Sequence, residues 1–209
     1  MGRSKSSHQW LKKHFDDEYV KRAQREGWRS RAVFKLEEID KKYRLLRPGM
    51  TVVDLGAAPG GWSQYAAKVL AGKGRIVALD ILEMDDLTGV EFIQGDFTED
   101  EALDLLMNNL GESGVDLVLS DMAPNISGMR AVDQPRSIYQ VELAVDFAAK
   151  VLVENGDLLF KAFHGEGFEE IVRTVRGDYR KVLIRKPRAS RPGSREVYVL
   201  AQGRKIKNV

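Results

Sequence analysis

A glycine-rich turn follows a short apolar segment and is the first stretch of this chain that suggests chemistry. In "TVVDLGAAPGGWSQY" the apolar residues lead into a turn that holds Gly56, Gly60 and Gly61. A turn of this kind after a strand is typical of sites for nucleotide-like ligands. A dinucleotide fingerprint requires a glycine where this chain has Ala58, and a P-loop requires a lysine where it has Trp62. A ligand without a phosphate group is therefore favoured.

Four acidic residues end the strands that we expect around this turn: Asp54, Asp80, Asp96 and Asp121. In an open parallel sheet the ligand lies beyond the carboxyl ends of the strands, so these acids meet at the ligand edge. Asp80 follows the turn by about 20 residues, the spacing at which a carboxylate reaches ribose hydroxyls. Asp96 can accept a hydrogen bond from an adenine amino group. S-adenosylmethionine combines these groups with a sulfonium cation, and we predict it as the cofactor.

If the acceptor of the methyl group is a hydroxyl, the site needs a side chain that takes its proton or stabilises its oxygen. Lys161 ends the apolar segment "DLLFK", where burial would make the neutral amine less costly. A nearby Lys35 would lower the pKa of Lys161, whereas Asp121 and Glu196 would favour its charged form. Two roles, general base and fixed cation, therefore remain open. The histidines are scattered, and we expect no metal site: His8, His14 and His164.

The elements that must position these residues alternate between strands and helices. Strands are expected over 51–55, 74–80, 90–96, 115–121, 156–163, 179–186 and 195–202. Helices are expected over 8–27, over 31–43 with Ser30 as a cap, from the glycine turn to about 70, and over 99–110, 135–153 and 167–177. This alternation predicts an α/β fold whose mostly parallel sheet has helices on both faces. The last two strands are expected to form an antiparallel hairpin with a long basic loop, "PRASRPGS".

Composition limits the classes of protein that are possible. The chain has 209 residues, of which 43% are hydrophobic, enough for one sizeable core. Cysteine is absent, which excludes a disulfide framework, a thiolate metal site and a cysteine nucleophile. No apolar run approaches the roughly 20 residues that span a bilayer, and the N-terminus lacks the apolar core of a signal peptide. A cytoplasmic location without membrane contact is expected.

Charge is distributed unevenly along the chain. Residues 1–49 carry 14 Lys and Arg against 7 Asp and Glu, and residues 171–209 carry 12 against 2. The intervening residues 50–170 carry 7 basic and 22 acidic side chains. If the two basic ends meet in the fold, they form one face that attracts a polyanion such as nucleic acid. The arginine-rich segment "PRASRPGSR" is expected to contact phosphates without reading sequence.

Five motifs resemble the FtsJ/RrmJ family of ribosomal RNA 2′-O-methyltransferases: "SRAVFKLEEID", "DLGAAPGGWSQY", "SDMAPN", "KAFHGEGF" and "GSREVY". The resemblance covers nearly the whole chain, with the motifs in the order of the family. It implies a Rossmann-like methyltransferase fold, a seven-stranded sheet with a C-terminal antiparallel pair, in one domain over 1–209. It also implies S-adenosylmethionine as donor and a uridine ribose of large-subunit rRNA as acceptor. The expected substrate is the assembled or nearly assembled 50S subunit, and the protein is expected to be a monomer.

The resemblance also implies the residues of the site. The Lys-Asp-Lys-Glu catalytic tetrad of the family falls on Lys35, Asp121, Lys161 and Glu196. Its cofactor contacts fall on Gly60, Trp62, Asp80, Asp96 and Asp121. The basic helical segment 1–49 is expected to contribute Lys35 and to help bind RNA. The sequence departs from the family pattern at none of these positions.

Three other functions share parts of the pattern. An NAD-dependent oxidoreductase would use the same strand, turn and Asp80, but Ala58 and the basic ends argue against it. A non-catalytic ribosome assembly factor would explain the charge, though not the acids at the ligand edge. An RNA base methyltransferase acting on an exocyclic amine would suit the turn "DMAPN". The two lysines favour a hydroxyl acceptor, since a hydroxyl needs activation that an amine does not.

Overall fold

The computed structural model describes residues 17–112, 114–124 and 127–206. Seven strands form one sheet in the order β3-β2-β1-β4-β5-β7-β6. The strands are β1 (Thr51–Leu55), β2 (Arg75–Asp80), β3 (Glu91–Gln94), β4 (Val115–Ser120), β5 (Leu152–Phe163), β6 (Tyr179–Arg185) and β7 (Glu196–Arg204). The first five are parallel, and β7 runs antiparallel between β5 and β6. The predicted mostly parallel sheet with a C-terminal antiparallel pair is confirmed.

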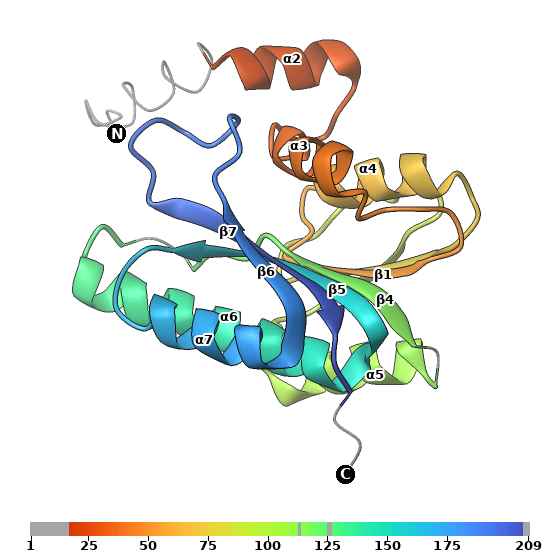
Figure 1. The fold of residues 1–209 in the computed structure, drawn as a ribbon. Helices are drawn as coiled ribbons and strands as arrows, with labels where there is room; N and C mark the ends of the chain where they lie inside the picture. Colours follow the sequence, from red (N-terminus) through yellow and green to blue (C-terminus); the bar gives the residue numbers. More distant parts are fainter. Residues whose placement is uncertain (1–16, 113, 125–126, 207–209) are drawn as a thin grey trace.

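Helices cover both faces of the sheet, as Figure 1 shows. They are α2 (Glu18–Glu26), α3 (Val33–Tyr43), α4 (Gly61–Leu70), α5 (Asp100–Leu110), α6 (Arg130–Val151) and α7 (Phe168–Asp178). α3 and α4 lie on one face, and α5, α6 and α7 lie on the other. The helix expected over 8–27 falls partly outside the described residues, and α2 is its described part.

Side-chain alternation along the central strands builds a separate core on each face. Val52 and Leu117 pack with the residues of α3 and α4, whereas Val53 and Val118 pack with those of α5, α6 and α7. All four are fully buried. Strands buried on both faces read as continuous apolar runs, such as "DLVLS" in β4 and "IVAL" in β2. The sheet is therefore a rigid base whose carboxyl edge can hold side chains in fixed places.

Two local expectations were wrong. Ser30 is not the N-cap of α3, because the helix begins two residues later than expected, with Ala32 as a cap that makes no side-chain hydrogen bond. The long helix α6 begins at Arg130 rather than at Pro135, so the proline lies inside it. Asp133, within α6, accepts hydrogen bonds from the backbone N–H groups of Ser127 and Gly128, which orders the entry to the helix.

None of the helices in the described ranges is long and apolar enough to cross a membrane.

Gly56, at the end of β1, offers a test of how tightly the ligand edge is built. Its φ of 76° is left-handed, and an added Cβ would lie 3.0 Å from the backbone N and Cα of Met122. Gly72 has a similar φ of 74°, but a Cβ there would meet none of the described atoms within 4 Å. Left-handed backbone costs a non-glycine residue about 1–2 kcal/mol. We expect Gly56→Ala to lose about 1–3 kcal/mol more than Gly72→Ala, because Gly56→Ala is also overpacked.

Urea denaturation of the two variants and the parent chain measures this difference. Equal free energies of unfolding for Gly56→Ala and Gly72→Ala would contradict the close approach of Met122 to the turn.

Candidate functional site

A cavity of ≈ 480 Å³ lies beyond the carboxyl ends of the parallel strands. Three of the four expected acids line it: Asp80, Asp96 and Asp121. Gly56 and Ala58 of the glycine turn form part of its wall. No lysine, arginine or histidine is among the described residues that line it. The cavity therefore suits a ligand that brings hydroxyl or amino donors and positive charge rather than phosphate.

Backbone N–H groups hold the carboxylates of Asp80 and Asp96 in position. Asp80 accepts from Ala58 N at 2.9 Å with one oxygen and from Leu82 N at 2.8 Å with the other. Asp96 accepts from the N–H and hydroxyl of Thr98, both through Oδ1. A carboxylate has about four lone-pair sites, so each can still accept hydrogen bonds from a ligand. Asp80 also joins the two loops on which the cavity depends.

Gly60 and Trp62, both expected to contact the cofactor, do not line the cavity. Gly60 is the N-cap of α4 with φ 101°. The indole of Trp62 is 3% exposed, donates to the carbonyl of Ala32 at 2.9 Å, and packs on Tyr198 with ring centroids 5.7 Å apart. The Trp62 side chain thus supports Tyr198. The backbone N–H of Trp62 belongs to the first turn of α4, whose N–H groups have no partner within the helix.

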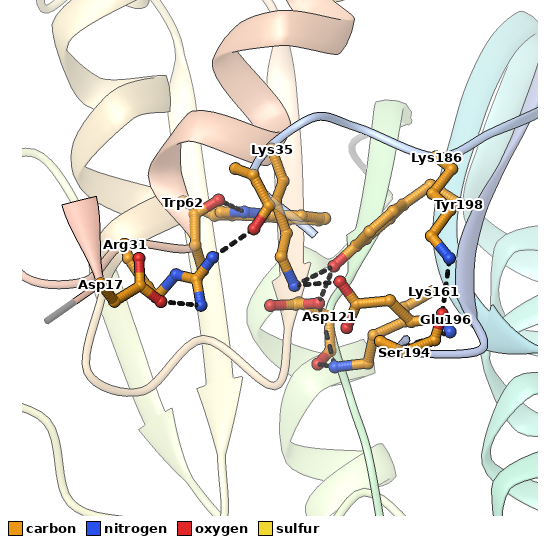
Figure 2. A network of polar contacts seen from close by, with 12 residues as sticks. Asp17, Arg31, Lys35, Trp62, Asp121, Lys161, Lys186, Ser194, Glu196 and Tyr198 are labelled. Atoms are coloured by element: carbon orange, nitrogen blue, oxygen red, sulfur yellow. Dashed lines mark hydrogen bonds and ion pairs between the residues drawn. The ribbon is translucent and has the colours of Figure 1, made fainter. Parts of the chain in front are cut away.

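The four residues of the expected tetrad lie close together (Figure 2), and one of them, Asp121, lines the cavity. Lys161 of β5 lies 3.0 Å from Asp121 Oδ1, and Lys35 of α3 lies 2.8 Å from Glu196 Oε1. Lys161 also donates to the backbone carbonyl of Asp121. Only 9% of Lys161 is exposed. Segments separated by up to 161 positions along the chain thus place two lysines and two carboxylates together.

Tyr198 connects the two ion pairs and is the residue that sequence reasoning missed. Its hydroxyl donates to Asp121 Oδ1 at 2.7 Å and accepts from Lys35 Nζ at 3.0 Å. Tyr198 is paired with Lys161 across β5 and β7, and it follows Glu196 by two positions on the same face of β7. This spacing of two residues, which places Tyr198 on the same strand face as Glu196, was the signal in the sequence that could have identified it. Burial and the nearby Asp121 raise the pKa of Tyr198 well above its usual value, so the phenol remains a donor.

The carboxyl of Asp121 is charged despite its surroundings. Burial by itself would raise its pKa, but the ammonium groups of Lys161 and Lys35 and the hydroxyl of Tyr198 outweigh burial and hold the pKa below its usual value. The network therefore contains a persistent negative charge between two cations.

A second cavity, of ≈ 240 Å³, has both members of the Lys35–Glu196 pair in its wall. It is lined by Arg31, Ala32, Lys35, Arg191 and Glu196. The basic loop 187–194 is fastened to the N-terminal segment at this point, since Arg31 donates to the carbonyl of Ala189. The backbone N–H of Arg188 likewise donates to Glu38 at 2.9 Å. The basic N-terminal segment and the basic C-terminal loop therefore meet beside the tetrad.

Asp54, the fourth expected acid, lies beneath the glycine turn and not in the cavity. It is 1% exposed and accepts from the Ser63 hydroxyl at 2.6 Å. Its Oδ1 has no hydrogen-bond partner among the described residues. Burial raises the pKa of Asp54 to about 7, with Asp121 and Asp80 adding to the effect against the Ser63 hydrogen bond. Among the described residues, no group of three or more His, Cys, Asp or Glu side chains could hold a metal ion.

Comparison with known proteins agrees with this geometry. The family described as FtsJ-like methyltransferase matches residues 28–204. The chain is 61% identical to "Ribosomal RNA large subunit methyltransferase E" of Legionella pneumophila (strain Corby), over 97% of this chain and 98% of that protein. It is 57% identical to the protein of the same name from Hydrogenovibrio crunogenus, over 98% and 100% of the two chains.

Solved structures with similar folds include a putative ribosomal RNA methyltransferase from Plasmodium falciparum. It has a TM-score of 0.75 and 26% identity, covering 85% of this chain and 98% of that one. The methyltransferase MycE, solved with Mg and SAH, has a TM-score of 0.55 and 15% identity, covering 90% of this chain and 49% of that one. The second likeness shows the fold alone.

The raised pKa of Asp54 predicts a specific pH dependence of stability. The unfolded carboxyl ionises near 3.8 and the folded one near 7, so unfolding is favoured increasingly as pH rises from about 4 to 7. Above pH 7 both states are ionised and the effect is constant. The shift corresponds to on the order of 4 kcal/mol. Asp54→Asn cannot ionise and should lack this loss.

Thermal unfolding of Asp54→Asn and the parent chain at pH 4.5 and pH 7.5 tests this. We expect the Tm of the variant relative to the parent chain to be higher at pH 7.5 than at pH 4.5. A difference that stays constant with pH would mean that Asp54 is ionised throughout.

Proposed function

Because the chain belongs to the FtsJ-like methyltransferase family, we propose that it methylates the ribose 2′-hydroxyl of a uridine in large-subunit ribosomal RNA. S-adenosylmethionine is the methyl donor, as the family indicates. The substrate in this proposal is the assembled or nearly assembled 50S subunit, which puts the reaction in the cytoplasm. The observation that carries the proposal is the Lys35–Tyr198–Asp121–Lys161 network between an acidic cavity and a basic one.

The acidic cavity fits the donor. Asp80 is suited to the ribose hydroxyls and Asp96 to the adenine amino group, since each carboxylate is oriented by N–H groups and retains lone pairs. Asp121, at the boundary with the lysines, adds negative charge near a sulfonium. Gly60 and the backbone of Trp62 do not line this cavity, so in this proposal they meet only a part of the cofactor that extends beyond it to the start of α4, whose N–H groups suit a carboxylate. When bound, the cofactor supplies the reactive methyl group.

The acceptor reaches the tetrad from the basic side. Arg31 and Arg191 line the second cavity and suit an RNA phosphate, while Lys35 and Glu196 suit the adjoining ribose. The segment up to residue 49 and the loop 187–194 together form the RNA-binding surface. Of the three alternatives, the amine-directed reaction would have no use for two lysines around one carboxylate.

Lys161 acts on the acceptor hydroxyl. Two of its possible donors go to the carboxylate and carbonyl of Asp121, and an ammonium has a third. Transfer of the methyl group to the hydroxyl oxygen would release the hydroxyl proton. As a neutral amine, Lys161 would keep two N–H donors for Asp121 and take that proton with its lone pair. As an ammonium, it would stabilise the oxygen with its third N–H while the proton passes to water. Asp121 orients Lys161 in both cases, and Tyr198 orients Asp121.

Replacement of Lys161 tests the mechanism. Lys161→Ala should lower single-turnover methyl transfer about 10²–10⁴-fold, as expected for a positioned acid–base group. Affinity for S-adenosylmethionine should barely change, because Lys161 acts on the acceptor. Lys161→Arg keeps the charge but cannot lose its proton, so substantial activity of this variant would exclude the base role. Lys150→Ala, at an exposed position of α6, serves as the control.

The assay uses 50S subunits isolated from cells that lack this protein. Resistance of the product to alkaline cleavage distinguishes a 2′-O-methyl group from a methylated base. Transfer by Lys161→Ala at the parent rate would overturn the assignment of the tetrad, and a base-methylated product would support the alternative acceptor.

The basic surface predicts a strong salt dependence of RNA binding. Each phosphate contact contributes about 0.7–0.9 to the slope of log K against log salt concentration. We expect Arg188→Ala, Arg191→Ala and Arg195→Ala to weaken RNA binding and reduce this slope without changing cofactor affinity. Arg173→Ala, at an exposed position of α7, should change neither. Filter binding over a range of salt concentrations measures the slope, and a flat response would contradict the proposed surface.

A further inference from the structure

The guanidinium of Arg29 joins two loops that are far apart in the sequence. Nη1 donates to the carbonyl of Asp85 at 2.7 Å and to that of Pro59 at 3.4 Å. Nη2 donates to the carbonyl of Asp86 at 2.6 Å. Pro59 belongs to the glycine turn after β1, and Asp85 and Asp86 belong to the segment after β2. One side chain from the N-terminal segment therefore fastens both loops through their backbones.

These two loops form one wall of the acidic cavity. Ala58 contributes from the first loop, and Ile81 and Leu82 contribute from the second. They also touch beneath the wall, where Met84 packs with Ala57. Arg29 itself does not line the cavity. It lies behind the wall, since a Cβ added to Gly60 would be 3.0 Å from Arg29 Nη1.

The backbone of the same segment is fixed to α4. Gln64 accepts from the N–H of Arg29 and donates to the carbonyl of Gly27, each at 2.9 Å. The Trp62 indole donates to the carbonyl of Ala32. The segment 27–32 is thus bonded to the first two turns of α4 at three points, and it continues directly into α3 and Lys35.

We propose that Arg29 is a positioning residue for the cofactor, which fixes the two loops at the separation that the cofactor requires. Arginine suits this task because its planar fork presents several donors in fixed directions, whereas lysine offers a compact charge on a flexible stem. The same bonds make the shape of the cofactor site depend on the segment that carries Lys35. The inference rests on the proposed function only in taking S-adenosylmethionine as the ligand of the cavity.

A rival role for Arg29 is contact with RNA phosphates, as its place in the basic N-terminal segment would suggest. The two roles differ in what Arg29→Lys should change. A phosphate contact survives with lysine, because the charge is retained. A bridge to three carbonyls does not, because a single ammonium cannot reproduce the fork.

The first experiment measures S-adenosylmethionine binding to Arg29→Lys, Arg29→Gln and the parent chain by calorimetry, without RNA. We expect at least tenfold weaker binding for both variants, a raised KM for the cofactor and a kcat close to that of the parent chain. RNA affinity of Arg29→Lys should be unchanged. Arg25→Lys is the matched control, because Arg25 lies on α2 with 77% of its side chain exposed. Unchanged cofactor affinity in both Arg29 variants would overturn the proposal.

Gln64→Ala breaks the backbone attachment of the same segment and supplies a second measurement. If Arg29 and Gln64 act through one arrangement, the double variant should lose less affinity than the product of the two single losses. Independent, fully multiplicative losses would contradict the shared role.

Hydrogen exchange in the ligand-free protein separates this inference from the proposed function. Arg29→Gln should increase amide exchange in residues 56–60 and 81–86, whereas Arg25→Lys should not. Unchanged exchange in these loops would refute the positioning role whatever ligand the cavity takes. Increased exchange in a protein whose parent chain fails to bind S-adenosylmethionine would refute the proposed cofactor and leave the positioning role intact.

Discussion

The charge of Asp121, largely shielded from water, is the constraint on which the rest of the site depends. A carboxylate withdrawn from water is tolerated only when cations and hydrogen-bond donors surround it. Its partners are Lys161 from β5 and Tyr198 from β7, so those strands must meet at the carboxyl end of β4. The antiparallel course of β7 makes this possible. Because β7 runs against β5, its first residue, Glu196, pairs with Phe163 at the end of β5, at the same edge as the ends of the parallel strands.

Charge separates around this network in a way that matches two different ligands. Asp80, Asp96 and Asp121 line the first cavity, while Arg31, Lys35 and Arg191 line the second together with Glu196. The uneven charge along the chain is therefore converted by the fold into two adjacent surfaces of opposite sign. A cationic methyl donor and a polyanionic acceptor are each attracted to the proper side, and the Asp121–Lys161 pair stands where the two would meet.

Sequence predicted the strands and the convergence of acids well, because both follow from period and from the geometry of parallel sheets. The spacing of Asp80 from the turn likewise predicted its place at the ligand edge, because it follows from the lengths of the helix and strand between them. Side-chain direction was not predictable in this way. Trp62 follows the turn directly, yet its indole packs on Tyr198, because α4 turns that face toward α3. Asp54 also ends a strand, but it points beneath the turn to Ser63. Tyr198 lies in the strand expected over 195–202, and its spacing from Glu196 indicates only a shared face; that its hydroxyl reaches Asp121 depends on how β7 packs against β5.

The raised pKa of Asp54 shows that the acids at the ligand edge repel one another, and it indicates which class of ligand would offset that repulsion. Burial is the largest cause, and the negative charges of Asp121 and Asp80 add to it. A fourth full negative charge beneath the turn would therefore be opposed by the carboxylates that line the cavity. A cation bound among those carboxylates would offset this repulsion, whereas an anion or a phosphate would increase it. The electrostatics of the ligand edge thus discriminate between ligand classes without any contact from Asp54, and they favour a sulfonium over a pyrophosphate.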